Sequence, residues 1–285
     1  MSNGQEEIKV RLDNIHSIEP LLAALRTISL SNWKLILRKL NLLAIYQEQL
    51  SNLYTQLAQL KGEKEQPVTS EKLTLAALGS NRGLCSNFNR DIVNVLNGQL
   101  SAVHDEKIEI IVVGERLKKL LDRRKVPFQH YFPFPSSSNL TLTLLMNKFQ
   151  DILPDIKIEC MSLIYNQYKG AASYQTKIVN LSKVEYLHSS TKNGYKLEDV
   201  IFDTEPEKIL SFLKDQIIWL HLYSSFLSSA ASEYSTRFQL MENASNNAER
   251  ISDELNIEVQ TLRRQKITSE MRELAIGAGL LKKYR

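Results

Sequence analysis

"ITSEMRELAIGAG", residues 267–279, closes the stretch of sequence that decides the fold. From Glu207 to Ile276 the chain contains neither glycine nor proline, the two residues that most often interrupt a helix. The stretch therefore predicts one uninterrupted helix, which at about 1.5 Å per residue would be on the order of 100 Å long. Small residues follow at positions 277–279, where they leave the end of the helix without bulk.

The apolar residues of this predicted helix repeat with a period near 3.5, which is typical of a left-handed supercoil with a partner helix. They are Leu210, Leu213, Ile217, Leu220, Leu227, Ala231, Tyr234, Phe238, Met241, Ala248, Leu255, Val259 and Leu262.

A second heptad stripe runs from about Ile8 to Lys61, and it supplies the partner helix. Ser29, Asn32 and Lys39 interrupt the stripe and predict a polar middle of the seam. Pro20 either kinks this helix or marks its start. The stripe consists of Ile15, Ile18, Leu22, Leu25, Ile36, Leu43, Tyr46, Leu50, Leu53, Leu57 and Leu60.

The middle of the chain alternates short apolar runs with helical patterns. The runs LTLAAL, KIEIIVVG and FQHYF predict strands, and IKIECMSLIYN and YQTKIVNLSKVEYL predict a hairpin. Helices are expected from Phe88 to Leu96, over ERLKKLLDRRK and after the loop PFPSSSN. This alternation predicts an α/β domain with a partly parallel sheet.

These three parts together predict the fold class. We expect an α/β protein in which N- and C-terminal helices form a long antiparallel coiled coil, with a Rossmann-like α/β domain inserted between them. The expected domains are residues 1–66 (N-terminal coiled-coil helix), 67–205 (α/β domain) and 206–285 (C-terminal coiled-coil helix).

Composition excludes several classes of protein. A net charge of +4 over 285 residues is too weak to predict nucleic-acid binding without a focused basic patch. The first residues have no apolar signal core, and no run approaches the length of a membrane span. Cys85 and Cys160 match no zinc spacing, and reduced thiols in the cytosol are expected.

No catalytic, cofactor or metal motif stands out. "GSNRGLC" (79–85) follows a predicted strand, where a phosphate-binding loop would lie, but it lacks both glycine-rich spacings, so we interpret it as a tight strand-to-helix turn. Cys85 is expected to be a buried structural thiol rather than a reactive one. The five histidines are scattered without metal-ligand spacing.

Several motifs resemble those of one family, the γ subunit of F-type ATP synthases. Ile267, Thr268, Glu270, Glu273, Gly277 and Ala278 match its C-terminal pattern I-T-x-E-x-x-E followed by G-A. "ASEYSTRFQLMENASNNA" (231–248) is similar to its A-S-E-x-x-x-R and M-x-N-A-x-x-N-A patterns. "GSNRGLCSNFN" and "LIYNQYKG" resemble two further motifs, in the same order along the chain.

Departures from the family pattern indicate a divergent member, such as a subunit of a second, alternative F-type ATPase. Ala23 and Leu25 stand where the family has lysine and methionine, and Arg264 replaces a glutamine. The basic tail LLKKYR (280–285) is also unusual.

The resemblance implies a central rotor stalk without catalytic residues or cofactors of its own. Its coiled coil would turn inside a ring of α and β subunits, and its α/β domain would rest on the ε subunit and the membrane c-ring. Ion flow, of H⁺ or Na⁺, would then be coupled to ATP synthesis or hydrolysis. The implied location is a peripheral membrane complex on the cytoplasmic face of a bacterial inner membrane, or of a cyanobacterial thylakoid.

The candidate partner contacts follow from the same resemblance. Arg263 and Arg264 would engage a β-subunit loop through charge-assisted hydrogen bonds, and Glu270 and Glu273 would continue that face. Two residues of the first helix, Lys34 and Arg38, would meet acidic residues of a β subunit. Gly277 and Ala278 would form the slim end of the shaft. Each charged residue could equally lie on a solvated helix face.

Two other functions remain open from the sequence. One is a γ-like paralogue that regulates an ATPase without rotating. The other is an α/β enzyme with helical dimerisation arms, which would have to work without a recognisable catalytic constellation. Only the first would co-purify with α and β subunits and be inactive alone.

Overall fold

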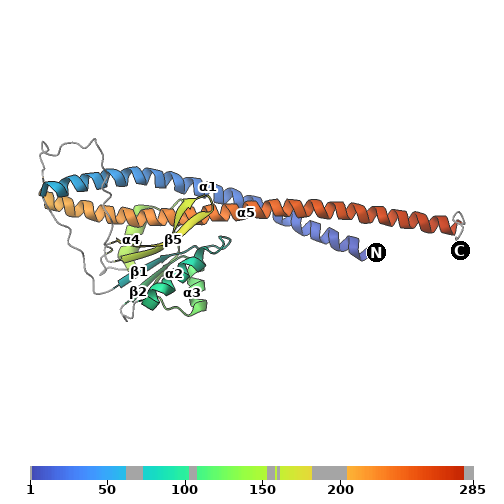
Figure 1. Ribbon diagram of the computed structural model, residues 1–285, viewed down its shortest axis with the longest axis horizontal. Helices are drawn as coiled ribbons and strands as arrows, with labels where there is room; N and C mark the ends of the chain where they lie inside the picture. Colours follow the sequence, from blue (N-terminus) through green and yellow to red (C-terminus); the bar gives the residue numbers. More distant parts are fainter. Residues whose placement is uncertain are drawn as a thin grey trace. The chain divides into compact units, whose positions relative to one another are not determined.

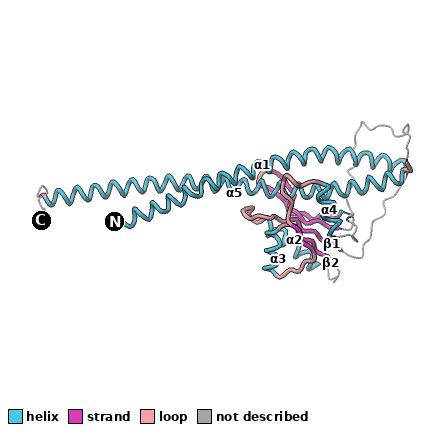
Figure 2. Tube along the Cα trace, turned by 180° about the vertical axis from the view of Figure 1, so that it is seen from behind, coloured by secondary structure: helices cyan, strands magenta, loops and turns pink. Residues whose placement is uncertain are grey.

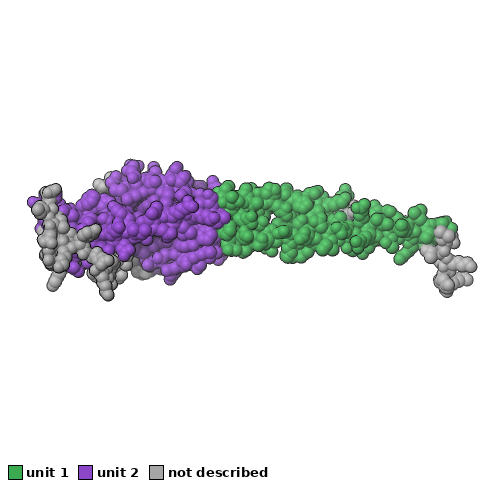
Figure 3. Space-filling model, turned by 90° about the horizontal axis from the view of Figure 1, so that it is seen from above, with its two compact units in different colours: residues 1–28, 238–285 green, residues 29–237 purple. Residues whose placement is uncertain are grey.

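A computed structural model describes residues 2–61, 73–102, 108–152, 158, 161–181 and 204–278. Its elements are α1 (Ser2–Lys61), β1 (Leu73–Leu78), α2 (Phe88–Ala102), β2 (Ile108–Val113), α3 (Glu115–Arg124), β3 (His130–Phe132), α4 (Leu142–Ile152), β4 (Met161–Gly170), β5 (Ser173–Asn180) and α5 (Pro206–Gly277). The chain forms two compact units, residues 1–28 with 238–285 (unit 1) and residues 29–237 (unit 2) (Figure 3). The proposed domain boundaries near 66 and 205 adjoin residues outside the described ranges and stay predictions.

The two long helices are present as expected (Figure 1). α5 runs for 72 residues without a break, which confirms the prediction from its lack of internal glycine and proline. α1 begins at Ser2 and contains Pro20 in its interior, so the interpretation of Pro20 as the start of the helix is wrong. A proline has no N–H, so one helical hydrogen bond is absent at this point.

The α/β domain lies in unit 2 and has a five-stranded sheet in the order β3-β2-β1-β4-β5. β1 pairs in parallel with both β2 and β4, and β2 pairs in parallel with β3. β5 runs antiparallel to β4 as the second strand of the expected hairpin. The prediction of a Rossmann-like, partly parallel sheet is therefore confirmed.

Both faces of the central strands β1 and β2 are covered, as their nearly continuous apolar sequences require. Alternate residues of β1 point to opposite faces: Leu75 and Ala77 join the core beneath α2 and α3, whereas Ala76 and Leu78 join the core beneath α5. Figures 1 and 2 show α2 and α3 on one side of the strands and α5 on the other. Unit 2 is thus a three-layer structure in which the part of α5 from Ile217 to Ala231 belongs to the domain core.

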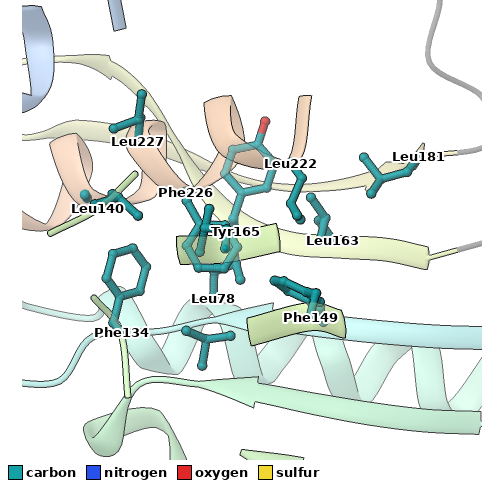
Figure 4. Packing of buried hydrophobic residues seen from close by; sticks show 14 of the residues in the cluster. Leu78, Phe134, Leu140, Phe149, Leu163, Tyr165, Leu181, Leu222, Phe226 and Leu227 are labelled. Carbon is teal, nitrogen blue, oxygen red and sulfur yellow. The ribbon is translucent and has the colours of Figure 1, made fainter. Parts of the chain in front are cut away.

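An aromatic cluster fills the core beneath α5. Phe226 of α5 lies against three rings of the α/β domain, with centroid separations of 5.4 Å to Phe134, 6.1 Å to Phe149 and 6.5 Å to Phe132. Figure 4 shows Phe134 and Phe149 on either side of Phe226, close to Leu78. Such rings dominate core energetics because each buries a large apolar area.

The seam of α1 differs in detail from the predicted stripe. One line of residues, spaced by seven, is buried or half-buried along the whole helix: Ile8, Ile15, Leu22, Ser29, Ile36, Leu43, Leu50 and Leu57. Ser29 does not interrupt this line but belongs to it, with only 2% of its surface exposed. The assignment of Ile18, Tyr46 and Leu53 to the seam is wrong, because all three are exposed.

The misassigned residues belong to a second line that is offset by three positions from the seam and lies on a neighbouring face of α1. Asn32 and Lys39 lie on this second line in unit 2. There the Ser137 hydroxyl donates to Asn32 Oδ1, and the Lys39 ammonium donates to the carbonyl oxygens of Ser137 and Leu140 at 2.8 and 2.9 Å. These two polar residues therefore fasten α1 to the loop before α4.

Gly79 allows the tightest approach in the α/β domain. A Cβ atom at this position would lie 2.3 Å from Leu117 Cβ and 2.8 Å from Asn89 Oδ1. We expect Gly79→Ala to lower the free energy of unfolding by about 1–3 kcal/mol, the usual effect of overpacking. Thermal unfolding followed by tryptophan fluorescence measures this, since Trp33 and Trp219 pack against the unit 2 core.

Gly98→Ala is the matched control. Gly98 lies inside α2, and a Cβ atom added to it would meet no atom within 4 Å. The same substitution there should raise stability by about 1 kcal/mol through helix propensity. Equal effects at the two glycines would contradict the close approach at Gly79.

Candidate functional site

Two polar contacts set the register of α1 against α5 in unit 1. His16 Nε2 lies 3.2 Å from Ser252 Oγ, and Arg26 Nη1 lies 3.0 Å from Glu242 Oε2. From the first contact to the second, the chain advances by ten residues in α1 and retreats by ten in α5. The helices are therefore antiparallel with one constant register in this unit, as predicted for the coiled coil.

The register also shows where α5 passes the beginning of α1. Counting outward from the contact of His16 with Ser252, Ser2 is level with Lys266. The α5 residues from Ile267 to Ala278 therefore extend beyond the first described residue of α1. This terminal segment contains four of the eight residues that the sequence predicts as partner contacts: Glu270, Glu273, Gly277 and Ala278.

An apolar line runs along the terminal segment. Ile267, Met271 and Leu274 are spaced by four and three residues, which places them on one face of a helix. Met271 is 66% and Leu274 is 74% exposed. Because contiguous exposed apolar groups mark interaction sites in soluble proteins, this face predicts a protein partner.

A charged line lies beside the apolar line, and three of its four members directly precede Ile267, Met271 and Leu274 in the sequence. It consists of Arg263, Lys266, Glu270 and Glu273, all exposed. Lys266 Nζ and Glu270 Oε1 lie 3.9 Å apart, an exposed ion pair that contributes little stability to the fold. An apolar line with charges along its edge is the pattern of a helix that docks into a groove or sleeve.

The remaining predicted contacts are also exposed. Arg264 lies next to Arg263, and Gly277 and Ala278 end the described helix. A Cβ atom on Gly277 would meet no atom within 4 Å, so nothing in the described part of this chain requires glycine there. Gly279 and the tail 280–285 lie outside the described residues.

Lys34 and Arg38 belong to unit 2 and point away from its core. Their neighbour Lys39 is the basic residue of this region that the α/β domain binds. Burial lowers the pKa of Lys39, which is consistent with its position against the loop before α4. The roles proposed for Lys34 and Arg38 stay predictions.

The polar side chains of the loop after β1 form hydrogen bonds within the α/β domain. Asn81 Oδ1 accepts from the backbone N–H groups of Phe134 (2.8 Å) and Glu115 (3.2 Å), and the Asn81 amide donates to the Phe134 carbonyl. Asn89 Oδ1 accepts from the Ser80 N–H at 2.9 Å. These bonds join three connections at one sheet edge, as expected of a tight strand-to-helix turn.

Cys85 is a buried thiol in this loop, as the sequence predicts. It is 3% exposed, and its Sγ lies 3.6 Å from Ser80 Oγ. Burial raises the pKa of the thiol and so favours the unreactive protonated form. Cys160 lies outside the described residues.

In the described part of the chain, no three histidine, cysteine or acidic side chains gather in a way that could hold a metal ion. None of the described helices combines the length and apolar character that a membrane crossing requires.

Comparisons with known proteins give one consistent result. A family model described as ATP synthase matches residues 4–281. The ATP synthase gamma chain of Flavobacterium johnsoniae is 25% identical over 282 residues, with 97% of this chain and 98% of the relative covered. That of Fusobacterium nucleatum is 24% identical over 294 residues, covering 98% and 99%.

Solved structures with a similar fold come from mitochondrial ATP synthases. A chain in the Euglena gracilis OSCP/F1/c-ring structure covers 100% of this chain and 99% of its own length, with a TM-score of 0.63 and 16% identity. A chain of the Tetrahymena thermophila central stalk/c-ring structure covers 79% and 99%, with a TM-score of 0.56 and 20% identity.

Proposed function

The chain belongs to the ATP synthase γ-chain family, and on that premise we propose how its helices and its α/β domain act. It is a non-catalytic subunit of the central stalk of a rotary ATP synthase. Its partners are the α and β subunits of the catalytic head, the ε subunit and the c-ring. The observation that carries this function is the uninterrupted α5, which belongs to the α/β domain core at one end and exposes an amphipathic face at the other.

The terminal segment of α5 is the part that acts on the catalytic head. Ile267, Met271 and Leu274 pack against the ring of α and β subunits, and the adjacent charged line differs in its contacts from one β subunit to the next. Such a difference is necessary, because a subunit shifts the equilibrium of a nucleotide site only as far as its contacts differ between states. Rotation of an asymmetric helix therefore cycles the β subunits through distinct affinities.

Arg263 and Arg264 engage a β-subunit loop through charge-assisted hydrogen bonds, and Glu270 and Glu273 continue the same surface. Their exposure on α5 supports this assignment. Gly277 and Ala278 keep the end of the shaft slim within the ring. Lys34 and Arg38 contact acidic residues of a β subunit from α1.

The assembled protein is a peripheral membrane complex. The cytoplasmic face of a bacterial inner membrane is the proposed location, since the relatives reported above are bacterial. A cyanobacterial thylakoid is the second candidate. The translocated ion, H⁺ or Na⁺, depends on the membrane subunits.

Single-molecule rotation tests the proposed function. The chain is reconstituted with its α and β subunits, the head is fixed to a surface, and a bead is attached to α3 of the α/β domain. ATP should drive stepwise rotation in one direction. Hydrolysis without rotation would favour a regulatory paralogue. Failure to assemble would favour the alternative of an α/β enzyme with helical dimerisation arms.

The same assay tests the two arginines. Arg263→Ala with Arg264→Ala should slow rotation at least about ten-fold, since a hydrogen bond to a charged group contributes about 1.5–3 kcal/mol. Arg123→Ala is the control, because Arg123 is exposed on α3 in the α/β domain. Equal rotation rates in both variants would contradict the assigned role of Arg263 and Arg264.

A further inference from the structure

β4 extends past the end of its neighbour β1. The ladder between them ends with Ala77 opposite Ile164, and β1 itself ends at Leu78, whereas β4 continues to Gly170. On the side away from β5, the backbone of β4 after Ile164 has no strand partner among the described residues. Backbone N–H and C=O groups inside a protein require hydrogen-bond partners from elsewhere.

Serine hydroxyls of α5 supply these partners. Ser228 Oγ accepts from the Tyr168 N–H at 2.9 Å. Ser232 Oγ lies 2.9 Å from the carbonyl oxygen of Asn166 and 2.9 Å from that of Ser228 in its own helix. Asn166 and Tyr168 are two residues apart, so their backbone groups face the same edge of the strand. α5 therefore takes the place of a neighbouring strand along this part of β4.

A third serine reaches the neighbouring strand. Ser229 Oγ donates to the carbonyl oxygen of Leu78, the last residue of β1, at 3.4 Å. Ser228, Ser229 and Ser232 share one face of α5 and are almost completely buried. Their small side chains allow the helix backbone to approach the strands closely enough for hydroxyl groups to bridge the two.

A buried ion pair fastens the next turn of α5 to the loop after β1. Arg237 Nη2 lies 2.5 Å from Glu233 Oε1, and only 7% and 9% of the two side chains are exposed. Arg237 Nε also donates to the Gly83 carbonyl at 3.3 Å, and its guanidinium lies 5.6 Å from the Tyr234 ring centroid. The carbonyl links α5 to the loop that Asn81 and Asn89 hold in place.

We propose that these contacts, the bonds of Ser228, Ser229 and Ser232 to the strands and that of Arg237 to Gly83, form the joint that transmits torque between the α/β domain and α5. This inference rests on the proposed rotary function. Apolar packing holds the helix on the sheet, but the attraction is non-directional. Torque about the helix axis can therefore rotate α5 against the sheet without breaking a specific contact. Hydrogen bonds lose strength steeply when their angle or length changes, and they therefore resist this rotation.

The elastic response of the assembled complex tests the joint. The reconstituted head is held without ATP, and the angular fluctuations of a bead on α3 are recorded for the unaltered chain and for Ser228→Ala with Ser232→Ala. The angular variance should increase to about one and a half times its original value, because it varies inversely with torsional stiffness. The variant removes two of the hydrogen bonds that join α5 to the α/β domain, which also include the bond from the Tyr223 hydroxyl to the Leu140 carbonyl at 3.1 Å. An unchanged variance would overturn the proposed joint.

Ser235→Ala is the matched control. Ser235 is buried in the same helix, and its hydroxyl donates to the Ser232 carbonyl of α5 itself rather than to a strand. It should leave the angular variance unchanged, and an equal increase in this control would also overturn the proposal. If the double variant does not assemble, Ser228→Ala alone undergoes the same measurement with the same two outcomes. Rotation of the unaltered complex under ATP tests the proposed function separately.

Discussion

Arg237→Met should lower the free energy of unfolding by about 3–5 kcal/mol, the usual effect of leaving one partner of a buried ion pair alone. The Glu233 carboxylate would then stay buried without its counter-charge, and the Gly83 carbonyl would lose its donor. Denaturant unfolding followed by tryptophan fluorescence measures the loss, because Trp33 and Trp219, the only tryptophans of the chain, both report on unit 2.

This loss should depend on pH. Burial raises the pKa of Glu233, and Arg237 opposes that shift. Without Arg237 the folded-state pKa lies further above the unfolded-state value of about 4.3, so the folded protein holds a proton that the unfolded chain has released. The deficit relative to the unaltered chain is therefore smallest at low pH, where both folded chains hold the proton. It grows as the pH rises through the interval between the folded-state pKa of Glu233 in the unaltered chain and the higher folded-state pKa in the variant.

Glu233→Leu combined with Arg237→Met is the control. Replacing both partners of a buried pair by apolar side chains is often neutral, so the double variant should be more stable than Arg237→Met alone and should lose the pH dependence. A double variant as unstable as the single one would show that the bond to Gly83, and not the isolated carboxylate, dominates.

The main features of the fold follow from simple patterns in the sequence. The absence of glycine and proline between Glu207 and Ile276 predicts the length of α5 correctly, because these two residues are the ones that most often interrupt a helix. The alternation of apolar runs and helical segments likewise predicts the order of strands and helices in the α/β domain. Both predictions depend only on the residue types within each segment, and not on contacts between distant segments.

The faces of α1 could not be assigned so easily. Two apolar lines offset by three residues run along this helix, and an apolar residue of either line fits a heptad pattern. Ser29 looks like an interruption yet lies in the seam, whereas Ile18 looks like a seam residue and is exposed. Only the position of the α/β domain and of α5 decides which line is buried, and neither is encoded in the local spacing.

The sequence does not predict the serine face of α5, for a related reason. Serine in a helix is usually exposed or bonded to its own backbone, so Ser228 and Ser232 gave no signal of a contact with a strand. That contact exists because β4 extends beyond the end of β1, and this extension depends on the register of the two strands in the sheet. The buried pair of Glu233 and Arg237 has the i, i+4 spacing of an ordinary surface pair, and its burial is equally invisible in the sequence.

The terminal segment of α5 did carry a readable signal. The heptad positions of Leu255, Val259 and Leu262 would continue at Lys266, Ser269 and Glu273, which are polar. The apolar residues Ile267, Met271 and Leu274 lie one or two positions later. A change of phase in the apolar pattern indicates that the helix presents a different face. It occurs at the level where α5 passes the beginning of α1.

This change of phase leads to the second prediction of large effect. The variant Ile267→Ser with Met271→Ser and Leu274→Ser should weaken the binding of the chain to its α and β subunits on the order of a thousand-fold or more, since burying each such side chain contributes about 1.5–3 kcal/mol. The isolated variant should unfold like the unaltered chain, within about 0.5 kcal/mol, because these residues are exposed before assembly. Titration of the labelled chain into the assembled α and β subunits measures the affinity.

Leu84→Ser serves as the control for this prediction. Leu84 is also an exposed leucine, but it lies in the loop after β1, so its replacement should not change the affinity for the catalytic head. If the triple variant binds as tightly as this control, the apolar line is not the surface that binds the α and β subunits. The contact would then rest on the adjacent charged line from Arg263 to Glu273, and binding would weaken steeply with rising salt, as exposed charge pairs do. The salt dependence of the affinity thus distinguishes an apolar sleeve from an electrostatic one.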